Sequence, residues 1–195
     1  MKLILASTSR IRGELLAKAG ITFESVKPEV DETELKRQSP GLSPGDLALK
    51  LAAAKAVSVT NRYPGALVIG ADQVLNLEGR AFDKPDSVET ARRQLTDLRG
   101  RRHVLETALC CAQDGKIAWQ HLGQAGLTMR DFSEAFLTDY LREVGQDVTT
   151  SVGGYKLEGR GAQLFDRIEG DYFTILGLPL LPLLDFLRRK GVLPA

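Results

Sequence analysis

VIGADQVLNLEG, residues 68–79, combines a buried strand with a charged residue. The run Val68 to Ala71 is apolar and rich in β-branched side chains, which is typical of a strand inside a sheet. Asp72 follows directly. A carboxylate at the end of a buried strand costs free energy to dehydrate unless another group compensates it. Asp72 is therefore the first candidate functional residue of this chain.

The segments around this strand alternate between strand and helix patterns, which indicates an α/β fold. We predict strands at 3–6, 23–28, 66–72, 103–113, around 117–119, 127–130 and 162–165, with 73–77 either extending the third strand or turning back as a hairpin. We predict helices from residue 10 to Gly20, 44–59, 88–98, from 131 or 133 to 144, and 179–190, and a loop over 29–45.

The dipeptide Asp114-Gly115 is typical of a tight hairpin turn, so the predicted sheet is mixed rather than all-parallel. Two arrangements remain open: one continuous domain, or two lobes that share an elongated sheet and border a cleft. Clefts at strand ends are where α/β proteins usually bind ligands.

Composition excludes several classes of protein. The chain has 195 residues, 43% of them hydrophobic and 26% charged, and these are ordinary values for a globular protein. A net charge of +1 provides no overall attraction for nucleic acid or an anionic membrane. Basic residues are not interleaved with aromatic ones, so a nucleic-acid partner is not expected.

Neither a membrane location nor an oxidising compartment is indicated. The apolar part of MKLILASTSR is too short for a signal peptide, and no apolar run has transmembrane length. Cys110 and Cys111 are adjacent on a predicted strand and so point to opposite faces, which disfavours a disulfide between them. We expect a cytoplasmic protein with no membrane partner.

The opening stretch LILASTSRIR, residues 3–12, is a candidate anion site. A strand, a turn rich in hydroxyls and a helix start place backbone N–H groups and serine hydroxyls at a positive helix end, where phosphate is stabilised. Arg10 and Arg12 would add charged donors. Alternatively, Ser9 is only a helix cap and both arginines are solvated.

Two lysines are candidate partners of Asp72. Lys84 lies in FDKP, and with Asp72 it would supply a general base and a phosphate-binding cation to one cleft; alternatively the two form a structural ion pair. Lys55 lies in an alanine-rich helix, where it either extends from a buried face to solvent or contributes to the site.

Two loops complete the candidates. In SVGGYKLEGRGAQ, residues 151–163, glycines allow close backbone approach to a ligand, while Tyr155, Lys156 and Glu158 offer stacking, charge and hydrogen-bond acceptance. The alternative is a flexible surface loop. In the acidic run EVDETE, residues 29–34, Asp31 or Glu32 either turns inward to hold a metal or orient a water, or belongs to a solvated charge run.

Taken together, these motifs resemble those of the Maf family of nucleoside triphosphate pyrophosphatases. The matching pieces, in order, are LILASTSRIR, GITFESVKPEVDE, LALKLAAAKA, VIGADQVL, FDKP, GYKLEGRGAQLF and IEGDYFTILGLPL. The resemblance implies a single Maf-like domain over 1–195, with a mixed elongated sheet flanked by helices and two lobes around a deep cleft, as in the Maf and ITPase folds. It also implies a homodimer, and a divalent cation, Mg²⁺ or Mn²⁺, as cofactor.

The resemblance further implies hydrolysis of a nucleoside triphosphate to the monophosphate and pyrophosphate, removal of modified nucleotides, and a link to septum formation. Asp72 matches the proposed proton acceptor of the family. The positions matching those that contact phosphate or line the cleft are Ser7, Ser9, Arg12, Glu32, Lys55 and Lys84. We expect Asp72 to be the catalytic residue and these six to bind substrate.

Three positions bear on the base. Gln73 resembles the 7-methyl-GTP branch, whereas the dTTP/UTP branch has Thr there. Glu158 stands where the dTTP/UTP branch has Gln, and a carboxylate accepts from the N1–H and amino groups of guanine but donates to no carbonyl of thymine. Ile11 matches neither branch, because the 7-methyl-GTP branch has Trp there and the dTTP/UTP branch has Arg. We therefore expect a modified purine such as 7-methyl-GTP.

The opening motif also departs from the family pattern, because Arg10 replaces a proline and Gly13 replaces a basic residue. A second function therefore stays open, a nucleotide-binding regulator of septum formation with little or no catalysis. Measured pyrophosphate release distinguishes the two.

Overall fold

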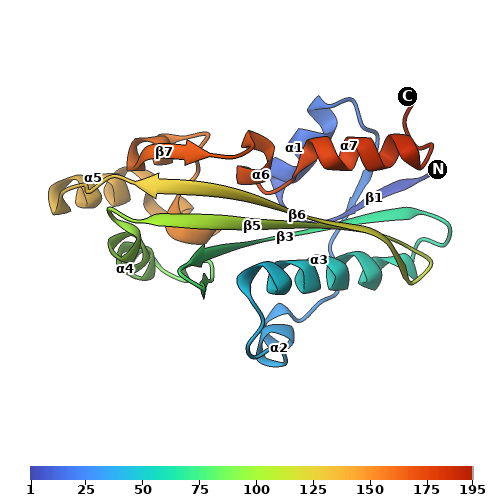
Figure 1. Cartoon of the computed structure of the whole chain (residues 1–195), viewed down its shortest axis with the longest axis horizontal. Coiled ribbons are helices and arrows are strands. Elements are labelled where there is room, and N and C mark those ends of the chain that lie inside the picture. Colours follow the sequence, from blue (N-terminus) through green and yellow to red (C-terminus); the bar gives the residue numbers. More distant parts are fainter. Residues whose placement is uncertain (195) are drawn as a thin grey trace. The chain divides into compact units, whose positions relative to one another are not determined.

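The computed structural model describes residues 1–194 and contains a mixed sheet of seven strands with helices packed on it (Figure 1). The strand order is β2-β1-β3-β5-β6-β7, and β4 pairs with β3. The strands are β1 (Leu3–Ala6), β2 (Glu24–Val26), β3 (Leu67–Leu77), β4 (Arg80–Phe82), β5 (Arg102–Gln113), β6 (Lys116–Met129) and β7 (Phe165–Glu169). β1 is parallel to β2 and β3, while β3–β4 and β6–β7 are antiparallel, which confirms the mixed α/β prediction.

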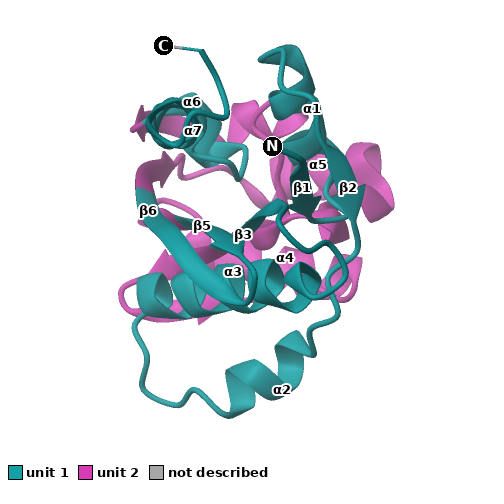
Figure 2. Ribbon diagram, turned by 90° about the vertical axis from the view of Figure 1, so that its right-hand side faces the viewer, with its two compact units in different colours: residues 1–73, 107–123, 171–195 teal, residues 74–106, 124–170 magenta. Residues whose placement is uncertain are grey.

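The chain divides into two compact units (Figure 2). Unit 1 comprises residues 1–73, 107–123 and 171–195, and unit 2 comprises 74–106 and 124–170. The strands β3, β5 and β6 contribute residues to both units.

Unit 1 is a layered structure with helices on both faces of its strands. Its helices are α1 (Arg10–Lys18), α2 (Glu32–Arg37), α3 (Pro44–Thr60), α6 (Tyr172–Ile175) and α7 (Leu180–Arg189). Helix α3 covers one face, and α1 and α7 cover the other (Figures 1 and 2). One apolar core lies on the α1 and α7 side, where Leu67, Ile69 and Ala71 of β3 pack with leucines of both helices. Because side chains alternate along a strand, Gly70 and Asp72 face the α3 side.

Sequence signals account for the start of helix α3 and for one hairpin turn in unit 1. Ser43 caps α3 by accepting from the Asp46 N–H, and Pro44 occupies the first helical position, as predicted. The turn Asp114-Gly115 has positive φ at both residues, 49° and 76°, which is the geometry required by a two-residue hairpin turn between β5 and β6.

Unit 2 is built on the remaining parts of the long strands with β4 and β7. Its helices are α4 (Val88–Leu98) and α5 (Glu134–Val144), followed by the 3₁₀ turns η1 (Gly145–Thr150), η2 (Val152–Gly154) and η3 (Arg160–Leu164). Helix α4 packs against α5, η1 and η2. Ser87 and Ser133 cap the two α-helices with their hydroxyl groups. Within residues 1–194 no helix combines the length and the apolar character needed to span a bilayer.

Several predicted boundaries are wrong. Residues 29–45 contain α2, which Asp31 caps by accepting from the Glu34 N–H. The strands predicted at 117–119 and 127–130 are one strand, β6, because backbone pairing carries it through the polar and glycine-containing middle. Residues 160–164 form η3, so the strand predicted at 162–165 is β7, at 165–169. Residues 73–77 extend β3, and α6 was not predicted.

Candidate active site

Asp72 lies where β3 extends beyond its parallel neighbour β1. The register pairs Ala6, the last residue of β1, with Gly70, so Ser7 and Asp72 both lie past the end of that pairing. The carboxyl ends of parallel strands are the usual ligand side of an α/β sheet. The Ser7 hydroxyl and the Asp72 carboxylate therefore both lie just past the carboxyl end of β1, where β3 continues without this partner.

Gly70 allows helix α3 to lie close against β3. A Cβ atom at this position would collide with the Ala52 carbonyl oxygen and the Ala56 nitrogen of α3. Glycine on the strand and alanines on the helix thus allow the two backbones to approach, as small residues do at close contacts. Residue 55, between these two alanines in the helix, is thereby brought to Asp72.

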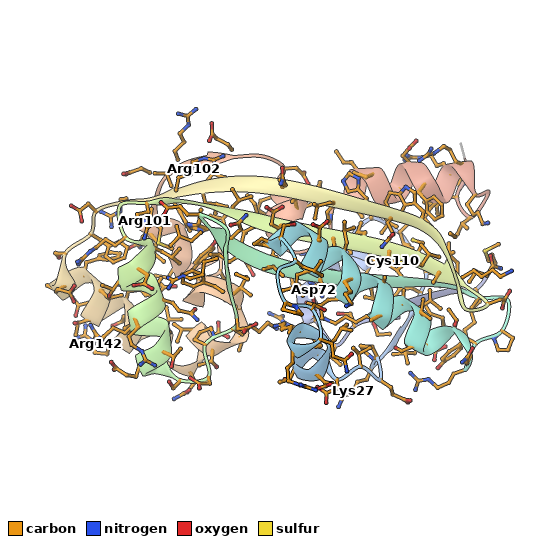
Figure 3. The ribbon with its side chains drawn as sticks, turned by 60° about the horizontal axis from the view of Figure 1, so that its bottom comes forward. Lys27, Asp72, Arg101, Arg102, Cys110 and Arg142 are labelled. Atoms are coloured by element: carbon orange, nitrogen blue, oxygen red, sulfur yellow. The ribbon has the colours of Figure 1, made fainter. Side chains whose placement is uncertain are left out.

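Lys55 joins two carboxylates. Its Nζ donates to Asp72 Oδ1 over 2.5 Å and lies 2.9 Å from Glu32 Oε1. The Lys55 and Asp72 side chains are only 9% and 10% exposed, whereas the Glu32 side chain is 45% exposed. Lys55 therefore does not extend to solvent. Of the two acidic candidates, Glu32 turns toward the site, whereas Asp31 caps α2. Figure 3 labels Asp72 beside helix α3.

The environment of Asp72 favours a basic carboxylate. Burial raises the pKa of the Asp72 carboxyl above its ordinary value, and the positive charges of Lys55 and Arg12 offset part of that rise. A free aspartate is a weak base near neutral pH because its pKa is about 3.9. Desolvation thus moves the pKa of this group in the direction that proton acceptance requires.

The start of α1 differs from the other serine-capped helices. Ser43, Ser87 and Ser133 each accept a backbone N–H with the side chain, whereas Ser9, at the cap of α1, makes no such bond. Instead the Ser9 N–H donates to Ser7 Oγ over 3.1 Å. The first amides of α1 therefore lack a side-chain cap among the described residues, and such amides stabilise anions.

Arg12 is held by backbone carbonyls. Its Nε donates to the Gly177 oxygen over 2.7 Å and its NH1 to the Ala71 oxygen over 2.9 Å. Burial lowers the pKa of the Arg12 guanidinium, although the Asp72 charge opposes this. Its remaining N–H groups are the ones available to phosphate. Arg10, in contrast, is exposed and pairs with Glu14.

The two candidate specificity residues of unit 1, Ile11 and Gln73, both contact other parts of the protein. Ile11 packs against the apolar core as a partly buried side chain. Gln73 points to the face of β3 opposite Asp72, where its Nε2 donates to Thr107 Oγ1 and to the carbonyls of Thr174 and Ile175. Gln73 was predicted as a residue that bears on the base, but its hydrogen bonds to Thr107, Thr174 and Ile175 were not predicted. The close approach of α3 at Gly70 was not predicted either.

Lys84 and Glu158 belong to unit 2, and both are exposed. Lys84 follows β4, and Glu158 lies in the segment between η2 and η3. That segment is anchored at Tyr155, whose hydroxyl lies 2.7 Å from Nε2 of the buried His103. The predicted flexible-loop alternative is therefore wrong at Tyr155, which is buried and hydrogen-bonded.

Unit 2 also contains a cavity of about 240 Å³ beside this segment. Tyr140, Asp147, Tyr155, Lys156 and Arg160 are among the residues that line it. Two of the lining residues, Lys156 and Asp147, form an ion pair of 2.5 Å. The charges of these two side chains therefore largely neutralise each other.

The Asp72 and Glu32 carboxylates of unit 1 fit a divalent cation that binds together with the substrate. No group of three or more His, Cys, Asp or Glu side chains within residues 1–194 is placed to hold a metal ion. Asp72 and Glu32, however, contact the same ammonium group. Mg²⁺ is usually bound by one or two carboxylates together with substrate phosphates. These two carboxylates suit that mode of binding.

A comparison with protein families identifies the chain. The model described as "Maf: Maf-like protein" matches residues 2–190. The chain belongs to the Maf family. This confirms the resemblance found in the sequence motifs, which span the same part of the chain.

Individual relatives of this Maf protein have two kinds of name. A protein called "7-methyl-GTP pyrophosphatase" from Mesorhizobium japonicum is 50% identical over 194 residues, 98% of each chain. A "Nucleoside triphosphate pyrophosphatase" from Granulibacter bethesdensis is 51% identical over 195 residues, 99% of each chain. Among solved structures, a dITP/XTP pyrophosphatase from Mycobacterium abscessus aligns over 100% of this chain and 98% of its own with a TM-score of 0.43 and 16% identity, too weak a likeness to support an inference.

Proposed function

We propose that this Maf protein is a nucleoside triphosphate pyrophosphatase, a hydrolase that acts on an acid anhydride to yield the monophosphate and pyrophosphate. The names of its relatives support this activity. The observation that carries it is the buried Asp72–Lys55 pair just beyond the carboxyl end of β1, where its parallel pairing with β3 stops, beside the start of α1.

In the proposed reaction, Asp72 accepts a proton from the attacking water. Lys55 binds Oδ1, so Oδ2 is the oxygen we assign to the water. The water oxygen forms a bond to the α-phosphorus, the bond from that phosphorus to the bridging oxygen breaks, and pyrophosphate leaves with that oxygen. Desolvation of Asp72 strengthens it as a base.

Phosphate binding is proposed for the groups around the start of α1. Ser7, Ser9, the first amides of α1 and the free N–H groups of Arg12 supply donors, and Lys84 supplies a further cation. A divalent ion, Mg²⁺ or Mn²⁺, bound with the substrate near Asp72 and Glu32 would neutralise phosphate charge.

For the base, we propose a modified purine with 7-methyl-GTP as the first candidate. Glu158 supports this choice, because a carboxylate complements the N1–H and amino donors of guanine and the positive charge of a methylated ring. We further propose that residues 1–195 act as one Maf-like domain, as a homodimer in the cytoplasm with two lobes around a cleft.

The test is a substrate panel. Purified protein is incubated with Mg²⁺ or Mn²⁺ and each common nucleoside triphosphate or 7-methyl-GTP, and monophosphate and pyrophosphate are quantified. We expect equal amounts of both products and the highest kcat/KM with 7-methyl-GTP. A preference for dTTP or UTP would overturn the base assignment alone. No release from any triphosphate would overturn the activity and favour the nucleotide-binding regulator.

A further inference from the structure

The side chain after Asp72 has all its hydrogen-bond donors engaged. The Gln73 amide nitrogen has two hydrogens and lies 2.8 Å from Thr107 Oγ1, 3.1 Å from the Thr174 oxygen and 3.1 Å from the Ile175 oxygen. Thr107 Oγ1 in turn donates to the Thr174 oxygen over 2.9 Å. Gln73 therefore connects β3 to β5 and to α6 within unit 1.

The segment that receives these bonds is itself well anchored. Asp171 caps α6 by accepting from the N–H and the hydroxyl of Thr174, each over 2.8 Å. Thr174 is 4% exposed and Thr107 is fully buried. Replacing a donor in such an environment leaves buried acceptors with fewer partners, which costs more than the loss of an exposed hydrogen bond.

Arg12 also binds this segment, on the other side of Asp72 from Gln73. Arg12 bonds the Ala71 carbonyl, directly before Asp72, and the Gly177 carbonyl, directly after α6. Residues 174–177 are thus tied to β3 on both sides of Asp72, by Arg12 and by Gln73. Beyond Gly70, β3 no longer pairs with β1. Arg12 and Gln73 therefore supply hydrogen bonds to this part of β3 where β1 supplies none.

We propose that Gln73 is a positioning residue that, with Thr107, holds the β3 backbone at Asp72 against residues 174–177 and so fixes the carboxylate for reaction. The proposal rests on the pyrophosphatase function proposed above. It assigns Gln73 a role in the rate for every triphosphate, and not a direct contact with the base. A general base must be held close to its productive position, because a misplacement of about 1 Å can cost about 100-fold in rate.

The two roles give different kinetics. Loss of a positioning residue lowers kcat by a similar factor for all substrates and changes KM little, because binding is retained while the reacting group is misplaced. Loss of a base contact raises KM and changes the order of preference among the triphosphates.

The experiment compares Gln73→Met and Thr107→Val with the wild type and with Gln113→Met. Gln113 is a matched control, because it is also a β-strand glutamine of unit 1 whose Nε2 donates to a backbone carbonyl, that of Gly65, at an exposed turn. For each protein, kcat and KM are measured on the substrate panel. Calorimetry with a non-hydrolysable α,β-methylene triphosphate analogue gives Kd and the fraction of molecules that bind.

We expect Gln73→Met and Thr107→Val to lower kcat about 10- to 100-fold for every triphosphate, with binding stoichiometry unchanged and KM within about threefold. Gln113→Met should match the wild type. If Gln73→Met does not fold, Thr107→Val carries the same test, because it removes the hydroxyl that Gln73 contacts. An unchanged kcat, or a raised KM with a new order of substrates, would overturn the positioning role. Wild-type protein that releases no pyrophosphate would overturn the proposed function, and this inference with it.

Discussion

Replacing Lys55 with methionine tests the energetics of the site. Methionine keeps much of the length of the lysine stem but removes the ammonium group that lies 2.5 Å from Asp72 Oδ1 and 2.9 Å from Glu32 Oε1. The variant therefore leaves the Asp72 carboxylate buried without its nearest positive charge. We expect a large loss of folding stability at alkaline pH.

The size of the loss follows from burial. Removing one partner of a buried pair typically costs about 3–5 kcal/mol, because the other charge stays desolvated. The Glu32 contact adds about 0–1 kcal/mol at most, since solvent screens this half-exposed carboxylate. Loss of Lys55 also raises the pKa of Asp72 further. Stability is therefore lost as pH rises through that pKa, and the penalty is smaller in acid, where Asp72 takes up a proton.

Urea denaturation at pH 5 and pH 8 measures this effect, with Trp119 as the probe because it is the single tryptophan and stacks on Phe186 in unit 1. Lys50→Met is the control, since Lys50 is an exposed lysine of the same helix and should change stability by less than about 0.5 kcal/mol. In an Asp72→Asn background, Lys55→Met should cost far less, because no unpaired carboxylate remains. A loss below about 1 kcal/mol that is equal at both pH values and in both backgrounds would refute the reasoning.

Two further predictions concern the packing around the site and unit 2. Gly70→Ala should destabilise the protein by about 1–3 kcal/mol or more and lower kcat, because its Cβ collides with the backbone of α3; thermal unfolding equal to that of the wild type would contradict this. Burial lowers the pKa of His103 to about 4, below its ordinary 6.5, so the stability it contributes is present above pH 6.5 and lost as pH falls through about 4. This is worth about 3 kcal/mol, and His103→Gln should abolish that part of the acid sensitivity in urea titrations at pH 7 and pH 4. An identical acid loss in the variant would refute it.

Local signals predicted the elements that carry the site. The apolar run before Asp72, the cap at Ser43 and the turn at Asp114-Gly115 each depend on neighbouring residues, and the structure contains all three. Helix α2 was missed because it is short and polar, although Asp31 with Glu34 three residues later is a helix-start signal. The middle of β6 lacks a strand pattern, and pairing with distant strands decides its conformation.

Within the candidate site, the sequence indicated candidate residues, and the structure adds what each of them contacts. Lys55 and Asp72 are 17 positions apart, and an alanine-rich helix facing a glycine on a strand was the available signal for their contact. The bonds of Arg12 to Gly177 and of Gln73 to Thr174 span more than a hundred positions. Such contacts depend on how α6 packs on β3, which no local pattern specifies.

The central claim is that Asp72 accepts the proton from the attacking water. The most direct measurement is pyrophosphate release by Asp72→Asn beside the wild type, with Mg²⁺ and the best substrate of the panel, and with circular dichroism to confirm that both proteins are folded. The account predicts release by the wild type and a loss of at least about 100-fold in the folded variant. A folded Asp72→Asn protein that releases pyrophosphate at the wild-type rate would contradict it.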